Sequence, residues 1–296
     1  MAVLDTGDLV LPDTLIGPWL EKVQYGSTVA QLVNQAPMTY GTESAMTFTL
    51  GEAEYVGEGA NKASTTFSTA TKTTKPFKFQ ITVRMTEEVI WADEDAQQGV
   101  VQELLDQAQP ALSRALDYGV FHGINPTGGA AVAAMTESLS DTTNSVEIAA
   151  QERYAILDAA DALVLADGYV PRDLAVDPSW AAGFSSDRTS EGIKRYPEFN
   201  LGSDVSTLEG HRTSVNKTVG AIGVAATATD VKAFVGDFST IRWGVQRRIP
   251  LELIRFGDPD GQGDLKRNNQ VAFRLEILYG WGIFDLDAIT AVVDAV

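Results

Sequence analysis

The chain has 296 residues, 44% of them hydrophobic, which is enough to bury one large core or two smaller ones. Its 40 acidic residues outnumber its 22 basic residues and give a net charge of −18, which disfavours a protein that wraps DNA, since such a protein needs a basic surface. The absence of cysteine excludes disulfides, thiol nucleophiles and zinc-thiolate sites.

The sequence carries no export or membrane signal. No stretch approaches the ~18 uninterrupted apolar residues of a membrane span. The start, from Met1 to Asp5, lacks the basic region of a signal peptide. We therefore expect the protein to act in a cytoplasm.

Charge is unevenly distributed along the chain. Residues 1–58 hold one base and eight acids, residues 59–86 hold five bases and no acid, and residues 87–117 hold one base and eight acids. A basic segment thus lies between two acidic segments.

Residues 1–45 predict an extended arm with one short helix, because prolines and glycines interrupt every longer periodicity. The arm's apolar patches are too small to form a core, so the arm needs a surface to lie on. Next, Met46, Phe48 and Leu50 alternate with threonines, and residues 77–85 alternate apolar with polar. We expect these two stretches to pair as antiparallel strands.

Residues 51–76, between these strands, predict a long hairpin arm rich in hydroxyl side chains. Each leg of about 13 residues would reach roughly 43 Å, whereas a compact domain of this length has a radius of gyration of only ~19 Å. Such a ribbon is marginally stable alone, so either it is disordered or another subunit covers it. Its basic charge and the acidic flanks of a like copy favour the second reading, and a flexible polar loop remains the alternative.

A long helix is predicted over residues 94–121, about 42 Å in length. Acidic residues at 93–95 suit its start, and an apolar stripe runs from Val101 to Val120. Pro110 predicts a kink near 106–110 and not two helices. A run of glycines and a proline from Gly119 to Gly129 predicts its end.

The middle of the chain predicts an α/β unit of roughly 100 residues. A helix is expected over 151–166, a short buried strand over 174–176 with a helix start behind it, and irregular structure over 183–206. Further strands are expected over 220–225 and 233–235. Towards the C-terminus we expect two partner strands, over 249–254 and 271–277, joined by a turn over 258–264, and then a short apolar segment over 288–296.

The sequence offers few residues from which a catalytic site could be built. His122 and His211 are the only histidines, and the chain lacks both a Gly-x-Ser-x-Gly elbow and a phosphate-binding loop. The turn from Asp258 to Asp264 has oxygen ligands suited to calcium but lacks the full EF-hand spacing, so a plain turn is favoured. We expect no enzyme activity, no cofactor and no metal site.

Several segments, in order, resemble the tailed-phage major capsid protein family, which has the Hong Kong 97-type fold. They are Ala53–Gly59, Phe67, the alternating strand, Thr86–Ile90 and the long helix with its exit Asp117-x-Gly119-x-x-x-Gly123-x-x-Pro126-x-Gly128, then Leu208–Gly210, Val235–Phe238 and Asn269-x-Val271-x-Phe273-Arg274-x-Glu276 leading to Ala288. Each motif is weak alone, but their order and spacing are specific and cover nearly the whole chain.

The resemblance implies an α+β fold with an N-terminal arm, an extended β-hairpin loop, a peripheral domain built from a long spine helix and a β-ribbon, and an α/β axial domain. The implied bounds are 1–45 for the arm, 46–85 for the loop, 86–129 with 236–285 for the peripheral domain, and 130–235 with 286–296 for the axial domain.

The resemblance also implies a structural protein that self-assembles into hexamers and pentamers of an icosahedral shell around double-stranded DNA, in a virion assembled in the host cytoplasm. Its implied partners are identical subunits, a separate scaffolding protein, a portal protein and possible decoration proteins. DNA would be enclosed without sequence-specific binding, and no membrane would be involved.

Two groups of residues are expected at contacts between subunits. The loop would contribute Lys62, Phe67, Lys72, Lys75 and Lys78. The acidic partner would be Glu87, Glu88, Asp93, Glu94 and Asp95 of a neighbour. One branch of the family cross-links a loop lysine to an asparagine with help from a glutamate, and Asn269 and Glu276 occupy roughly those places, although alternation puts them on opposite strand faces.

Two other functions remain open at this point. An encapsulin-like nanocompartment shell would keep the fold but enclose an enzyme instead of a genome. A soluble α/β enzyme or binding domain would instead be a monomer or a small oligomer.

Overall fold

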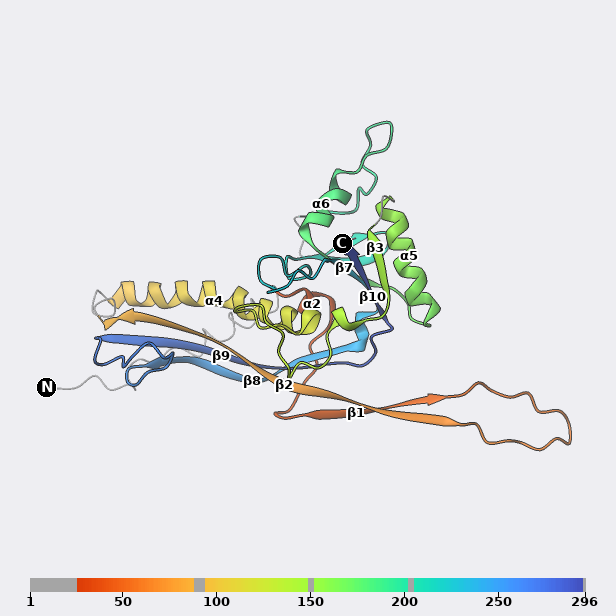
Figure 1. Ribbon diagram of the computed structural model, residues 1–296, viewed down its shortest axis with the longest axis horizontal. Coiled ribbons are helices and arrows are strands. Elements are labelled where there is room, and N and C mark those ends of the chain that lie inside the picture. Colours follow the sequence, from red (N-terminus) through yellow and green to blue (C-terminus); the bar gives the residue numbers. More distant parts are fainter. Residues whose placement is uncertain (1–25, 88–93, 149–151, 202–204, 295–296) are drawn as a thin grey trace.

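The computed structural model describes residues 26–87, 94–148, 152–201 and 205–294, and two sheets organise them (Figure 1). The first sheet has the strand order β1-β2-β9-β8, and the second has the order β3-β10-β7-β4-β6-β5. Within the described residues, no helix is both long enough and apolar enough to cross a membrane.

The elements have the following bounds. The first sheet contains β1 (Glu43–Leu50), β2 (Phe67–Thr86), β8 (Ile241–Ile254) and β9 (Gln270–Ile283). The second contains β3 (Ser145–Ile148), β4 (Asp173–Val176), β5 (Ser206–Leu208), β6 (His211–Val215), β7 (Val231–Gly236) and β10 (Ile289–Asp294). The helices are α2 (Thr28–Leu32), α4 (Glu94–His122), α5 (Arg153–Ala166) and α6 (Pro178–Ser186), with short 3₁₀ turns at Leu139–Asp141 and Phe238–Thr240.

Strand β2 is the longest element of the first sheet and changes partner along its length. Its residues 67–74 pair with β1, and its residues 75–86 pair with β9, both antiparallel. The expected pairing of Met46–Leu50 with residues 77–85 was therefore wrong. The threonine-rich stretch before Lys75 is itself β-prone, because threonine is β-branched, so it extends the strand and supplies the partner for β1.

Helix α4 lies along the first sheet (Figure 1) and is one helix through Pro110, as predicted; the kink there stays a prediction. Leu112, Leu116 and Val120 are buried, in the same core cluster as Trp281 of β9. The helix ends at His122, one residue beyond the predicted end at 121. A Cβ on Gly119 would lie 2.5 Å from the Trp281 ring, so this glycine serves close packing.

The second sheet confirms some predictions and corrects others. The helix over 151–166, the strand at 174–176 and the strand at 233–235 are present as α5, β4 and β7. The expected strand over 220–225 is a turn, in which Ala221 has a positive φ of 48°. The apolar C-terminal segment became β10, which lies between β3 and β7.

A buried carboxylate joins the N-terminal segment to the body. Asp117 of α4 accepts hydrogen bonds from the backbone N–H groups of Thr28 and Val29, at 2.9 and 3.1 Å. It also accepts from the hydroxyl of Ser27 and, at 2.7 Å, from that of Thr218. Burial raises the pKa of Asp117 to about 6, against the opposing effect of these four donors.

The chain between α2 and β1 is then fastened to β8. The Trp243 indole donates to the Val33 carbonyl at 2.9 Å, and the Ala36 N–H donates to the Trp243 carbonyl at the same distance. Gln246 and the backbone of Gly41 exchange two hydrogen bonds, of 3.1 and 2.7 Å. The described part of the arm therefore finds the surface it needs on its own chain.

The Asp117 junction should dominate local stability. Asp117→Ala leaves buried donors without an acceptor and should lower the free energy of unfolding by about 2–3 kcal/mol, measured by urea unfolding. Asp158→Asn, at an exposed position of α5, is the control and should have little effect.

The same group should make stability depend on pH. Because the folded pKa of about 6 exceeds the ordinary 3.8, the folded state binds the proton more tightly. The resulting stabilisation is complete below about pH 3.8 and is lost as pH rises through 6. When the pH is lowered from 7 to 4, the free energy of unfolding of the wild type should therefore rise by up to about 3 kcal/mol relative to that of Asp117→Asn. Parallel pH profiles of thermal unfolding for the two proteins would contradict this.

The contact of Gly119 with Trp281 should tolerate no added side-chain atom. Gly119→Ala would force the indole or the helix to shift and should destabilise the protein by about 1–3 kcal/mol, even though alanine favours helix formation. Thermal unfolding measures the effect. A stabilised Gly119→Ala protein would show that α4 and β9 can separate freely.

Candidate functional site

A two-stranded ribbon at one end of the first sheet projects away from the rest of the molecule (Figure 1). It consists of β1 and the first part of β2, paired from Glu43–Thr74 to Leu50–Phe67, and the loop 51–66 closes its far end. A hairpin therefore projects as expected, but with other bounds, since residues 51–66, which were expected to form most of its two legs, are a loop and the paired strands are 43–50 and 67–74.

One face of this ribbon is apolar and exposed. Met46, Phe48 and Leu50 share a face because strand side chains alternate, and Phe67 lies opposite Leu50 on the same face. Between 61% and 73% of each residue's surface is exposed. None of the described residues covers this apolar ribbon face, and uncovered apolar patches mark sites of protein contact.

The closing loop is acidic and open. Glu52, Glu54 and Glu58 are all exposed, and Tyr55 between them is 92% exposed. Gly59, with a φ of 79°, provides a bend that other residues rarely adopt. Together with the apolar ribbon face, this loop gives the ribbon a large accessible surface.

The loop lysines differ in their surroundings. Lys62 is exposed near the far end. Lys72 lies 3.6 Å from Glu137, Lys75 donates to the Thr136 hydroxyl at 3.2 Å, and Lys78 pairs with Glu276 at 2.7 Å. Three of the four therefore contact their own chain, which sequence reasoning did not anticipate.

The acidic residues expected to receive these lysines occur between positions 87 and 95 of the sequence. Glu87 pairs with Lys266 of its own chain at 3.0 Å. Glu88 and Asp93 fall outside the described residues, and Glu94 and Asp95 are described only as the first backbone turn of α4. Their contact with a neighbour's loop stays a prediction.

The two expected cross-link residues do not come together within one chain. Asn269 has a positive φ of 53° just before β9, and its carbonyl accepts from the Glu87 N–H at 2.9 Å. Glu276 is nearly buried inside β9 and bound to Lys78. Seven residues of strand separate them, which is about 23 Å.

The acidic turn between β8 and β9 holds an arginine. The Arg84 guanidinium donates to Asp260, to Asp258 at 2.9 Å, to the Gly263 carbonyl at 2.8 Å and to Gln270 at 3.1 Å. The side chain therefore occupies the position in which the turn's oxygens would hold a cation. Within the part of the chain that the structure describes, no cluster of metal-ligating side chains occurs.

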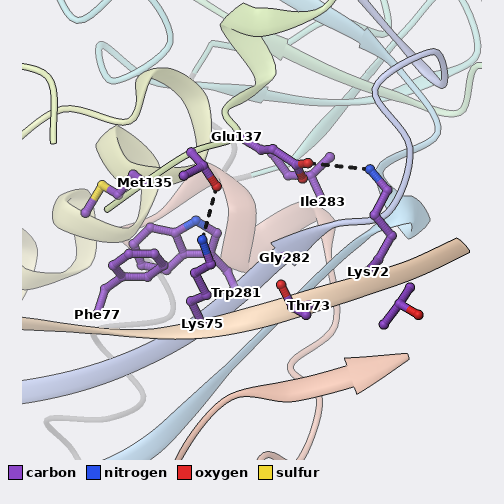
Figure 2. A pocket seen from close by; sticks show the side chains of 11 residues that line it. Lys72, Thr73, Lys75, Phe77, Met135, Glu137, Trp281, Gly282 and Ile283 are labelled. Carbon is purple, nitrogen blue, oxygen red and sulfur yellow. Dashed lines mark hydrogen bonds and ion pairs between the residues drawn. The ribbon is translucent and has the colours of Figure 1, made fainter. Parts of the chain in front are cut away.

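A polar crevice lies at the base of the ribbon, where β2 meets β9 and the loop 131–138 (Figure 2). It has a cavity volume of about 90 Å³ and opens to solvent. Lys72 and Lys75 reach from β2 towards Glu137 and Thr136, and the rings of Phe77 and Trp281, with centroids 4.0 Å apart and planes tilted by 30°, form one wall. No signal in the sequence marked residues 131–138 as the partner of these lysines.

Both histidines hold the structure together. His122 bonds Ser140 and the Val219 carbonyl, at 2.7 and 2.8 Å, and burial lowers its pKa. His211 lies 3.0 Å from Asp161. Burial alone would lower the pKa of His211, but the hydrogen bond and charge of Asp161 raise it above the ordinary value. The Ser140 hydroxyl beside His122 donates to the Phe121 carbonyl at 2.8 Å, so its proton is directed at the backbone and not at the imidazole.

Comparison with known proteins places the chain in a family. The phage capsid family matches residues 7–294. A solved structure from Mycobacterium phage Ogopogo is 42% identical, with a TM-score of 0.81, and the match covers 91% of this chain and 92% of that one. A structure from Gordonia phage Cozz is 26% identical, with a TM-score of 0.75, over 91% and 87% of the two chains.

A more distant structure, described as the capsid of a native GTA particle computed with C5 symmetry, shares the fold alone. It is 16% identical, with a TM-score of 0.60, over 92% and 91% of the two chains. No curated protein is a significant match. These findings favour neither the nanocompartment nor the soluble enzyme. The chain belongs to the phage capsid family and is a structural capsid protein with the mixed α+β fold of that family.

Proposed function

We propose that the chain is the major capsid protein of a tailed double-stranded-DNA phage and that its copies assemble into hexamers and pentamers of an icosahedral head. The observation that supports this most directly is the apolar ribbon face, which the described residues of its own chain leave exposed to water. A second copy is the partner that is always present at the same concentration.

The energetics favour a contact between copies. Burying each of four large apolar side chains contributes about 1.5–3 kcal/mol relative to leaving it in water. An isolated two-stranded ribbon is marginally stable, so contact with a neighbour would stabilise the ribbon as well as the assembly. The apolar contact also has to overcome the mutual repulsion of subunits that each carry a charge of −18.

Charge would add orientation to this contact. Lys62 is exposed, and Lys78 keeps 51% of its side chain exposed despite its ion pair with Glu276. These two are better placed than Lys72 and Lys75 to meet the acidic start of a neighbour's α4. Such exposed pairs contribute little affinity but fix the register of association.

The same charge suits a container for DNA. A strongly acidic subunit repels the phosphate backbone, so the enclosed duplex is not gripped by the wall. We infer a non-catalytic role, a location in the virion after assembly in the host cytoplasm, and cooperation with scaffolding, portal and possible decoration proteins. These partners rest on the family resemblance.

Removing apolar surface from the ribbon should block assembly without unfolding the subunit. Phe48→Ser with Phe67→Ser changes two exposed positions, so far-UV circular dichroism should be unchanged. The yield of particles, measured by sedimentation and negative-stain microscopy, should fall more than about tenfold, because 1.4 kcal/mol per contact is already tenfold.

The matched control is Ala45→Ser with Ala70→Ser, on the opposite face of the same ribbon. It should assemble as wild type does. Normal particle yield from the phenylalanine variant would remove the proposed contact. A wild-type protein that remained a monomer under all conditions would instead favour the soluble enzyme or binding domain.

Charge reversal at the far end of the ribbon should slow assembly in a salt-dependent way. Lys62→Glu would meet the acidic segment of a neighbour with a like charge. Light scattering should show slower assembly at low salt, and the difference should vanish near 1 M salt, where the Debye length is about 3 Å. Equal rates at low salt would show that Lys62 faces no acidic partner.

A further inference from the structure

The ribbon leaves the body at a joint where β2 changes partner, and its other strand is tied to β8 by the Glu43–Arg242 ion pair at 3.1 Å. Thr74 is the last residue of β2 that pairs with β1, and Lys75 is the first that pairs with β9. The next residue, Pro76, cannot donate a backbone hydrogen bond and lies opposite Gly280, which has no side chain. The β2 ladder therefore lacks one backbone donor just inside the point where the ribbon leaves, although Thr74 beside it is buried.

Two lysines span this joint and reach the same neighbouring loop. Lys72, on the ribbon side, lies 3.6 Å from the Glu137 carboxylate. Lys75, on the body side, donates to the Thr136 hydroxyl at 3.2 Å. Figure 2 shows both side chains pointing across the crevice towards the loop.

The loop 131–138 is anchored to the end of α4. The Val132 N–H donates to the Gly123 carbonyl at the exit of α4, and the Met135 N–H donates back to the Val132 carbonyl, each at 2.8 Å. After Glu137, Ser138 is held by the Asp141 carboxylate at 2.8 Å. The partners of the two lysines thus move with α4, not with the ribbon.

The contact between the ribbon and this loop is polar and accessible to solvent. The lysines meet their partners across the crevice, and the Lys72 and Glu137 side chains are 34% and 46% exposed. A half-exposed ion pair is weak and is screened by salt. Eight paired residues extend about 26 Å beyond the joint, so a rotation of about 10° there would move the loop end by 4–5 Å.

We propose that Lys72 and Lys75, bound to Glu137 and Thr136, form an electrostatic latch that sets the angle at which the ribbon leaves the body. When the latch is closed, the ribbon is held towards the exit of α4. When charge at the latch is screened or reversed, the ribbon swings about the joint between Thr74 and Pro76. The latch lies within one chain, so it does not depend on whether shells form.

The test follows the ribbon angle through a distance measured within the 296-residue chain, which has no cysteine of its own. Ala70→Cys on the ribbon and Ala159→Cys on an exposed position of α5 carry spin labels, and unlabelled protein dilutes the labelled chains so that only distances within one chain contribute. Pulsed electron spin resonance gives the distance distribution.

Lys72→Glu should shift and broaden this distribution, because two carboxylates then face each other. Lys72→Glu combined with Glu137→Lys restores the attraction with exchanged signs and should restore the wild-type distribution. Lys62→Glu, beyond the latch, should leave it unchanged.

An unchanged distribution in Lys72→Glu, or a charge exchange that fails to restore it, would overturn the latch. Because the readout is a distance within one chain, failure here would leave the proposed shell-forming function standing. Failure of assembly would likewise leave the latch standing.

Discussion

Four apolar side chains on the β1–β2 ribbon have no cover in the described part of their own chain, and much of the fold serves to hold them there. Strand β1 and the first part of β2 carry them out from the body, and the second part of β2 pairs with β9 over residues 75–86. That pairing lies over the core formed with α4, where Trp281 meets Gly119. The four apolar side chains therefore stay exposed to water, at a cost in free energy, until another molecule covers them.

Two polar clusters also help to hold the body, and with it the ribbon, in place. Asp117 joins α2, α4 and the segment after β6, and Arg84 fills the acidic turn between β8 and β9. Both arrangements have the oxygen ligands or the displaced pKa that are common at catalytic or metal sites. Here their partners are donors of the same chain, fully engaged, and their effect is to fix segments that lie far apart in the sequence.

The sequence allowed much of the first sheet to be predicted, because alternation at 77–85 and 271–277 and the apolar stripe of α4 are strong periodic signals. The pairing of β1 was not predictable in the same way. Apolar alternation at Met46–Leu50 matches several possible partners, and only the extension of β2 to Phe67 decides among them. The short strands β3, β5 and β6 carry too few residues for a periodic signal.

The contacts of the loop lysines and of Asp117 lay further beyond reach. Lys72 and Glu137 are 65 positions apart, as the two residue numbers show, and the loop that brings them together has no periodicity of its own. Asp117 was visible only as part of a helix-exit motif, since a carboxylate near an apolar stripe does not reveal that backbone N–H groups of α2 will meet it. The length of residues 51–76 predicted a projecting hairpin, but the sequence placed Met46, Phe48 and Leu50 beside residues 77–85 and did not predict the exposed apolar ribbon face.

The central claim is that copies of this chain cover the apolar ribbon face. Met46→Cys places a single thiol on that face, and Ala70→Cys places one on the opposite face. The rate of maleimide labelling should be high for both in isolated subunits and should fall strongly for position 46 alone once shells have formed. Equal labelling of position 46 in free and assembled protein would contradict the account.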